Sequence, residues 1–471
     1  MAENQLPKGW GLEPVSKLLT LFEIGARPKG GAGKLTEGVP SISAEHFNYG
    51  GQFKFQKMKY IPEDFFESLK KGVLEKGDVI VVKDGATTGK SAFIEDSFPF
   101  EKAAVNEHTF ILRSSNETTS KLIFYFTCSL TFERFISVAS GGSTIGGIKK
   151  GFVDDLRIPL PPLAEQQRIV AKLDKLFAHL EETKTRLNKI PQLLKNFRQS
   201  VLTQAVTGKL TEDWREENKP NSTGLIEIES KINLFPSEFE GNIPTNWKLL
   251  KAESICFKIT DGEHQTPKRI DEGKMLLSAK NVRSGFLDYS VFDCISEEDF
   301  DKCLKRCYAE KDDILIVSVG ATIGRAAIVD GSEKFALVRS VALLKPKEEI
   351  NGKYLLFVIQ SNTCQTVIEN VSQGSAQACL YLSKIKGLPI PVPSFEEQGK
   401  IVDLVDLYFN RIQVIEEKYN HLKKKIENLP QSILAKAFKG ELVEQLPTDG
   451  DAQELLDEIK KLKAQTTKKK K

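Results

Sequence analysis

The sequence lacks the marks of several large protein classes. No stretch approaches the ~18 consecutive apolar residues of a membrane-spanning helix, since the longest candidate, Leu122 to Phe132, holds a cysteine, a serine and threonines. The first ten residues lack the basic and then apolar pattern of a secretory signal. Seven cysteines, odd in number and scattered, do not suggest a disulfide framework. We therefore expect a cytoplasmic protein that does not contact a membrane.

A strong charge of either sign is also missing. Lysine and arginine total 67 against 64 aspartates and glutamates, so the net charge is +3. Without the last four lysines it is −1. The body is therefore not a polycation that holds nucleic acid by bulk charge, and any DNA contact must use localised basic and polar loops. The length of 471 residues predicts two or three domains.

No catalytic or metal-binding constellation is evident. The segment DGATTGKS, Asp84 to Ser91, nearly matches a phosphate-binding loop, but aspartate replaces the first glycine and the following SAFIED alternates like a strand. A second occurrence of the turn reads VGATIGRA, without the lysine and the hydroxyl residue. The five histidines show no metal spacing, and Cys303 and Cys307 have no second pair. We predict a tight turn and no cofactor or metal on this chain.

The chain contains a long internal repeat. IPLPPLAEQQRIV, starting at Ile158, returns as IPVPSFEEQGKIV, starting at Ile390, and RQSVLTQAVTGKL from Arg198 returns as PQSILAKAFKGEL from Pro430. Upstream, GDVIVVKDGATTGK matches DDILIVSVGATIGR, and LPKGW matches IPTNW. Four matches in the same order indicate a tandem duplication of roughly 230 residues.

Each copy begins with an α/β pattern and ends with a helical one. Short apolar runs, such as Val79 to Val82 and Ile314 to Val317, read as buried strands that end in GAT turns. A proline-rich stretch then predicts a stiff exit. After it, alternating four- and three-residue steps from Ile169 to Val201 and from Ile401 to Ile433 select nine and ten apolar residues out of ten.

These two stripes predict long helices, and an interior proline in each, Pro191 and Pro430, predicts a bend or a break. The two helices either pair with each other as a coiled coil or lie as amphipathic helices on separate cores. We favour pairing, because each supplies a matched partner for the other. A short amphipathic helix is also expected over Ala452 to Ala464.

The chain resembles the specificity (S) subunits of type I restriction–modification systems. PLPPLAEQQRIVAKLD, RQSVLTQAVTGKLTEDW and QSILAKAFKGEL look like the conserved regions of that family, and LPKGW and GDVIVV…GATTGK fit its pattern. The second copy departs from it by lacking a tryptophan equivalent to Trp214. The resemblance covers essentially the whole chain in the family's order, being strongest in the helical regions and the turns.

This resemblance implies two tandem α/β target-recognition domains separated by two long antiparallel helical spacers, related by a pseudo-twofold internal duplication. The expected boundaries are recognition domains at 1–157 and 241–389, helical spacers at 158–215 and 390–445, a linker at 216–240 and a tail at 446–471. The chain would be a non-catalytic subunit that reads a bipartite asymmetric DNA target. Two methyltransferase and two restriction subunits would dock on it and carry S-adenosylmethionine, ATP and magnesium.

The family cannot supply the DNA contacts residue by residue, so we nominate them by chemistry. Cations and hydroxyls on turns suit phosphate oxygens, and an arginine or lysine can reach a guanine. The candidates flank the two GAT turns, a second polar loop in each copy and the Met275–Leu277 run: Lys83, Thr87, Thr88, Lys90, Ser143, Thr144, Lys149, Lys150, Lys280, Arg283, Ser318, Thr322, Arg325, Ser375 and Gln377. For partner binding we nominate Glu165, Gln166, Glu397 and Gln398 at the helix starts, where a structural role is equally open.

Two other functions compete with DNA recognition. One is a coiled-coil scaffold that self-associates and does not bind DNA, and the other is an ATPase that uses DGATTGKS.

Overall fold

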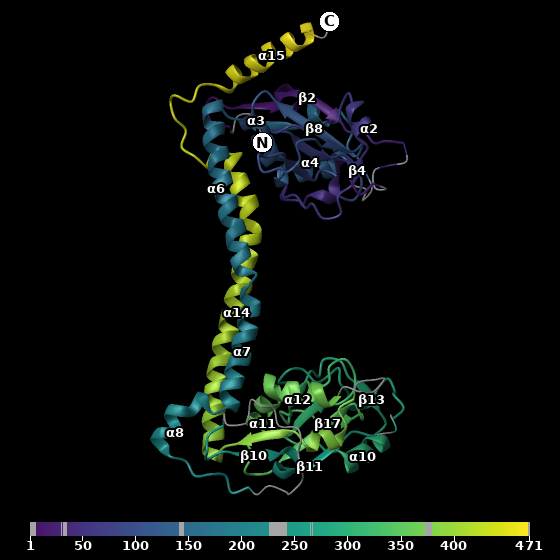
Figure 1. Cartoon of the computed structure of the whole chain (residues 1–471), viewed down its shortest axis with the longest axis vertical. Coiled ribbons are helices and arrows are strands. Elements are labelled where there is room, and N and C mark those ends of the chain that lie inside the picture. The colour runs from purple at the N-terminus through teal and green to yellow at the C-terminus, as the bar shows by residue number, and fades with distance from the viewer. Residues whose placement is uncertain are drawn as a thin grey trace. The chain divides into compact units, whose positions relative to one another are not determined.

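A computed structural model describes residues 6–29, 31, 35–140, 146–225, 243–263, 265, 267–372 and 379–469 (Figure 1). The chain forms two compact units. The first comprises Met1–Leu187 and His421–Lys471, and the second comprises Asn188–Asn420. Each unit therefore combines one α/β domain with helical residues from both copies of the repeat.

The first unit holds nine strands: β1 (Gly11–Pro14), β2 (Leu19–Ile24), β3 (Val39–Ile42), β4 (Tyr60–Ile61), β5 (Val79–Val82), β6 (Ser91–Phe93), β7 (Ala104–Val105), β8 (Thr109–Ser114) and β9 (Arg157–Leu160). Its helices are α1 (Val15–Leu18), α2 (Glu63–Glu67), α3 (Glu117–Thr127), α4 (Leu130–Ala139), α5 (Phe152–Asp155), α6 (Leu163–Leu187), the end of α14 (Phe395–Ala437) and α15 (Ala452–Lys469), with the 3₁₀ turn η2 (Ala44–His46). These counts refer to the described residues.

The second unit repeats this order. Its strands are β10 (Lys248–Lys251), β11 (Cys256–Asp261), β12 (Lys274–Leu277), β13 (Asp293–Ile295), β14 (Ile314–Val317), β15 (Ala326–Ile328), β16 (Ala336–Leu337), β17 (Val341–Pro346) and β18 (Pro389–Val392). Its helices are α7 (Ile190–Val206), η3 (Lys209–Thr211), α8 (Glu212–Asn218), α9 (Ala252–Ile255), α10 (Glu297–Arg306), α11 (Gly352–Gln360), α12 (Asn362–Ser372), α13 (Leu382–Lys386) and the first part of α14.

The two units contain the same three sheets. The strand orders β2-β8-β5-β6, β4-β3-β7 and β1-β9 in the first unit correspond to β11-β17-β14-β15, β13-β12-β16 and β10-β18 in the second. The registers agree as well, since Gly11 pairs with Leu160 in one unit and Lys248 pairs with Val392 in the other. The duplication in the sequence is therefore a duplication of the fold.

The predicted core strands and turns are confirmed. All residues of β5 (VIVV) and β14 (ILIV) are buried, as expected for β-branched and aliphatic runs at the centre of a sheet. Each strand continues through a GAT turn into an antiparallel partner, β6 or β15. Gly85 and Gly89 have φ of +94° and +85°, which a side chain rarely adopts, so this turn depends on glycine.

The proline-rich exit differs from the expectation in detail. We expected a stiff extended connector, whereas residues 157–160 and 389–392 form strands β9 and β18. Proline is compatible with these strands because each belongs to a two-stranded sheet and has a free edge. The end of each α/β domain is thus hydrogen-bonded to its beginning, through the pairs β1–β9 and β10–β18.

The two prolines in the helical stripes have different effects. Pro191 lies in the first turn of α7, immediately after a break that separates it from α6, where a proline costs no hydrogen bond. Pro430 lies inside α14, which continues for 43 residues. The expected break is therefore present in the first copy, and the second copy has no break.

Each unit places a helix of the first copy beside part of α14 (Figure 1). In the first unit, Leu173 of α6 joins the core that contains Leu434 of α14. In the second unit, the rings of Phe197 in α7 and Tyr408 in α14 lie 6.1 Å apart. The stripes are buried where they meet an α/β core, and several of their central residues are exposed: Thr183, Phe197, Ile415, Leu422 and Leu429.

Among the described helices, none alone has the length and apolar content to cross a membrane. The helices α3 and α4 reach those values only when taken together across a 69° bend. Most residues of α3 are buried in the core of the first unit, which accounts for their apolar character. The predicted helix near the C-terminus is confirmed as α15, which buries Leu455 and Ile459 in the same core.

Candidate nucleic-acid interface

The GAT turn of the first unit, residues 83–90, lies against the second polar loop. The Thr88 hydroxyl donates hydrogen bonds to the carbonyls of Gly85 (2.7 Å) and Gly146 (3.0 Å). The Ile148 amide donates to the Lys83 carbonyl at 2.8 Å. The described parts of two nominated segments, residues 83–90 and 146–150, therefore form one surface. Its residues Lys83, Thr87 and Thr88 are half-buried, and Lys149 and Lys150 are exposed.

Lys90 does not belong to this surface. Its side chain is buried, and Nζ donates a hydrogen bond to the Ala44 carbonyl at 2.6 Å and lies 5.1 Å from the centre of the Phe47 ring. Burial lowers the pKa of the Lys90 ammonium, with a smaller contribution from Lys54. The nomination of Lys90 as a DNA contact was therefore wrong. The lysine instead connects the GAT turn to the 3₁₀ turn η2 through its hydrogen bond to Ala44.

The same observations argue against a phosphate-binding loop. The residues after the turn form strand β6, whereas a nucleotide cradle needs a helix N-terminus behind the phosphates. With Lys90 turned inward as well, the ATPase alternative has no cradle in this segment.

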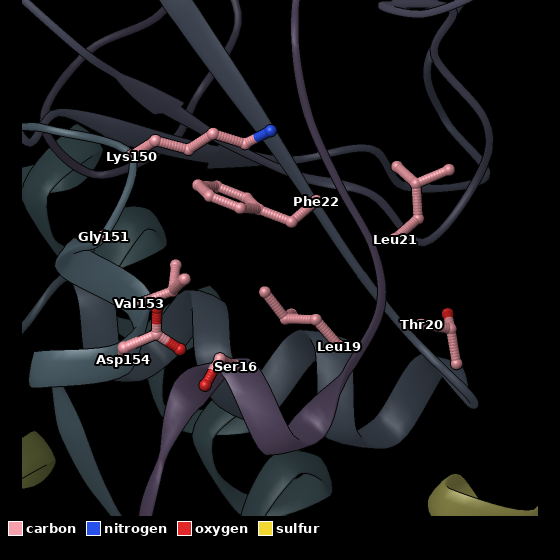
Figure 2. Close-up of a pocket in the computed structure, with 9 residues that line it drawn as sticks. All are labelled: Ser16, Leu19, Thr20, Leu21, Phe22, Lys150, Gly151, Val153 and Asp154. Atoms are coloured by element: carbon pink, nitrogen blue, oxygen red, sulfur yellow. The ribbon is translucent and has the colours of Figure 1, made fainter. Parts of the chain in front are cut away.

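Lys150 borders a shallow cavity of about 430 Å³ on the first unit (Figure 2). The cavity lies between Leu19 to Phe22 at the edge strand β2 and Lys150 to Asp154. The Lys150 ammonium is 5.8 Å from the centre of the Phe22 ring, and Asp154 lines the cavity from the same segment as Lys150 (Figure 2). An aromatic face with one cation suits stacking of a base or a sugar better than enclosure of a small ligand.

In the second unit the corresponding turn comprises residues 318–325, and none of its three nominated residues is exposed. Ser318 is buried, and its hydroxyl donates to the Arg339 carbonyl at 3.2 Å, so its nomination as a DNA contact is also corrected. Thr322 and Arg325 are half-buried. Arg325 donates at 3.5 Å to the Val282 carbonyl. It thus resembles Lys90, which occupies the equivalent position and also reaches a backbone carbonyl.

Lys280 and Arg283 are both paired with aspartates. The Lys280 ammonium lies 2.8 Å from Asp293, and Arg283 donates two hydrogen bonds to one oxygen of Asp288, at 3.0 and 3.1 Å. Hydrogen bonds from Ser290, and then from Arg283, lower the pKa of the Asp288 carboxyl to about 2. Either cation must exchange its aspartate for a base or phosphate in order to contact DNA.

Four nominated residues, Ser143, Thr144, Ser375 and Gln377, lie outside the described residues. One candidate was missed by the sequence reasoning. Arg339 is exposed beside the turn of the second unit, and within the described part of the chain it makes no ion pair. Arg339 reaches the turn only because β17, the strand that follows it, pairs with β14. No local sequence signal therefore identifies this residue.

The nominated partner-binding residues lie in the interior of their own units. Glu165 accepts a hydrogen bond from the Trp10 indole at 2.8 Å, and Gln166 bonds Thr119 and the Pro161 carbonyl. Burial, more than any other cause, raises the pKa of the Glu165 carboxyl. Glu165 and Gln166 are only 1% and 0% exposed, which favours the structural role.

The second unit builds the same arrangement with one addition. Glu397 accepts from the Trp247 indole at 2.9 Å, and it also accepts from Thr211 and Arg215, each at 2.8 Å. Gln398 is bonded to the backbone of Asn351 and of neighbouring residues. Both side chains are fully buried. The nomination of these four residues as direct partner contacts is therefore corrected to a role in joining each helix to its α/β domain.

The family model for the type I restriction modification DNA specificity domain matches residues 7–192 and 247–424. The chain belongs to this family. The EcoBI specificity subunit of Escherichia coli is 33% identical over 369 residues, which cover 76% of this chain and 75% of that protein. The EcoKI specificity subunit of Escherichia coli strain K12 is 29% identical over 484 residues, which cover 98% and 97%.

This chain shares its fold with a solved structure of a type I specificity subunit. The HsdS subunit of Thermoanaerobacter tengcongensis aligns with a TM-score of 0.60 and 17% identity over 93% of this chain and 98% of that one. The family profile matches each α/β domain with its following helix separately, in agreement with the repeat. The expectation of a restriction–modification specificity protein is thus confirmed.

Proposed function

We propose that this chain reads a bipartite, asymmetric DNA sequence, with each α/β domain recognising one half. The observation that carries the proposal is that the same fold, with the same Trp–Glu bond between domain and helix, occurs twice in the chain. A duplicated scaffold with different surface loops suits a ligand that has two different halves. In the first unit the surface formed by residues 83–88 and 146–150 is the candidate contact, with Lys149 and Lys150 exposed.

The junction that repeats the fold also orients the helices. Gly208, at the end of α7, has φ of +74°, and a Cβ there would lie 2.4 Å from Pro244. Gly440, after α14, has φ of +75°, and a Cβ there would lie 2.4 Å from Pro7. Each helix end is thus seated on the start of an α/β domain by the same glycine–proline contact.

In this proposal α6 and α7 pair with α14 as antiparallel coiled-coil spacers, and an approximate twofold axis relates the two domains. The length of the spacers sets the gap of unspecified bases between the two half-sites. Two methyltransferase subunits and two restriction subunits dock on the chain. Those subunits carry S-adenosylmethionine, ATP and magnesium and perform the chemistry, so that this chain supplies only the choice of sequence.

Mapping of adenine methylation in genomic DNA tests this function. Cells that express this chain with the methyltransferase subunit of the same system should gain one new motif, with two specified parts separated by a fixed gap. Cells with the methyltransferase subunit alone are the control. If the complex assembles, S-adenosylmethionine is present and no new motif is found, DNA target recognition is refuted and the scaffold alternative gains.

A further inference from the structure

A cleft of about 1060 Å³ lies in the first unit between the α/β domain and the helices α6 and α14. The loop from Asn48 to Phe55 and helix α3 form one wall, and the two long helices form the other. All of these residues belong to the same compact unit. The cleft differs in place from the GAT turn and from the cavity at Lys150.

The floor of the cleft is aromatic. Tyr125 of α3 stacks on Phe177 of α6 with ring centres 5.5 Å apart and planes 13° from parallel. Across the cleft, Phe53 and Phe55 are stacked at 5.7 Å. Phe55 is 38% exposed and the neighbouring Tyr49 is 67% exposed, so aromatic surface is accessible at the edge of the cleft.

Carboxylates outnumber cations around this floor. Glu95, Asp174, Glu181 and Glu427 line the cleft together with two lysines. Lys121 lies 3.0 Å from Asp174 and 3.4 Å from Glu95, and Lys184 lies 2.7 Å from Glu181. Within the described residues, Glu427 alone of the four has no ion pair. This charge disfavours a phosphate and favours a cation.

The second unit shows which cation fits such a place. There, the guanidinium of Arg198 in α7 lies 5.4 Å from the centre of the Phe409 ring and donates to Glu416 at 3.2 Å. Arginine is well suited to this role because it can stack on an aromatic ring and pair with a carboxylate at once.

The repeat makes the two places equivalent. Phe409 and Glu416 lie 232 positions after Phe177 and Lys184, and Pro430 lies 232 positions after Arg198. Phe177, Lys184 and Pro430 all line the cleft. The first unit therefore keeps the aromatic ring but has a proline in place of the arginine and Lys184 in place of its carboxylate partner. An open cleft lies there, with Glu427 of α14 as the carboxylate that has no ion pair among the described residues.

We propose that this cleft receives an arginine side chain from a protein partner, which stacks on the aromatic floor and pairs with Glu427. The inference rests on the proposed function, under which the partner is the methyltransferase subunit. The second unit fills the equivalent place internally, so the arginine site is specific to the first unit. A partner can thereby distinguish the first unit from the second, although both have the same fold.

A charge reversal tests the site with a matched control. Glu427→Lys should weaken binding of the methyltransferase subunit to the full-length chain by about tenfold or more. Glu417→Lys, which makes the same change at an exposed residue of α14 outside the cleft, should alter the affinity by less than about twofold. Equal weakening by both variants, or none by Glu427→Lys, would overturn the proposal.

A variant that fills the cleft with its own arginine provides a second test, in which the site is occupied and not disrupted. Pro430→Arg with Lys184→Glu copies the Arg198–Glu416 pair of the second unit into the first. This chain should remain folded and lose methyltransferase binding, while Pro430→Ala with Lys184→Ala should retain it. Thermal unfolding by circular dichroism checks folding in both. Unchanged binding of the self-filled chain contradicts the inference.

Crosslinking identifies the occupant. A photoreactive benzoylphenylalanine in place of the exposed Tyr49 should capture an arginine-containing peptide of the methyltransferase subunit, read by mass spectrometry. Capture of DNA instead would overturn the arginine site. Failure of the cleft and failure of the proposed function give different results, since a wild-type chain that produces a bipartite methylation motif supports the function even if all three cleft experiments fail.

Discussion

The two buried glutamates that join helix to domain predict unequal consequences of one substitution. Glu397→Gln removes the negative charge beside Arg215, whose side chain is only 17% exposed. Glu165→Gln makes the same change where, within the described residues, no arginine hydrogen-bonds to the carboxylate. The position equivalent to Arg215 is Pro447, and the nearby Arg168 pairs with Asp449 at 2.7 Å.

The magnitudes follow from these contacts. Removing one partner of a buried ion pair leaves the other charge uncompensated, so Glu397→Gln should lower the free energy of unfolding of the second unit by about 3 kcal/mol. Glu165→Gln keeps an acceptor for the Trp10 indole and should change the first unit by less than about 1 kcal/mol at neutral pH.

Urea unfolding measured by tryptophan fluorescence separates the two units. The chain has three tryptophans, Trp10 in the first unit and Trp214 and Trp247 in the second. A Trp10→Phe background therefore reports on the second unit, and a Trp214→Phe, Trp247→Phe background reports on the first. Equal losses, or a larger loss from Glu165→Gln, would refute the reasoning from Arg215.

The Glu165 variant also carries a pH dependence. Because burial raises the pKa of Glu165, the folded first unit binds this proton more tightly than the unfolded chain does. Wild-type stability therefore declines as pH rises from about 4.5 through the raised pKa, and this contribution to the decline is absent from Glu165→Gln.

Three further predictions concern single positions. Lys90→Met should lower the stability of the first unit by about 1–2 kcal/mol in urea unfolding and leave the salt dependence of DNA binding unchanged, whereas Lys149→Ala should reduce that dependence with little effect on stability. A larger salt effect from Lys90→Met would show that the lysine faces DNA after all. Gly440→Ala, at a positive φ and against Pro7, should lower the free energy of unfolding by more than about 2 kcal/mol. Gly399→Ala, in open space within α14, should not lower it and should raise it by up to about 1 kcal/mol. Equal shifts of the thermal midpoint would contradict the glycine–proline contact. Since the pKa of Asp288 is about 2, its bonds should stabilise the second unit above pH 3.8 and be lost as pH falls towards 2, and Asp288→Asn should abolish that acid-dependent loss, as followed by fluorescence.

The sequence predicted the parts of the fold that depend on local pattern. The runs Val79 to Val82 and Ile314 to Val317 are apolar throughout and form central strands, and the repeat indicates that both belong to one fold. The helix at residues 452–469 follows from its apolar spacing. Pro430 was harder to interpret, because whether a proline breaks or is accommodated in a helix depends on its packing, and α14 continues through it.

The candidate site was predicted less well, because polarity alone does not show which side a residue faces. Lys90 and Ser318 have the chemistry of phosphate ligands, yet both turn inward to backbone carbonyls supplied by residues distant in sequence. Glu165 and Glu397 were nominated for partner binding at helix starts, with a structural role equally open, and the tryptophans that bond them lie 155 and 150 residues away. Arg339 shows the converse, since only the fold brings it to the turn.

Exchange of one recognition domain shows whether each α/β domain reads its own half-site. Residues 1–157 are replaced by the corresponding domain of a specificity subunit with a different target, and the methylated motif is mapped in cells that supply the methyltransferase subunit. We expect one half of the motif to change while the other half and the gap are retained. A change in both halves, or in neither, would contradict the assignment of one half-site to each domain.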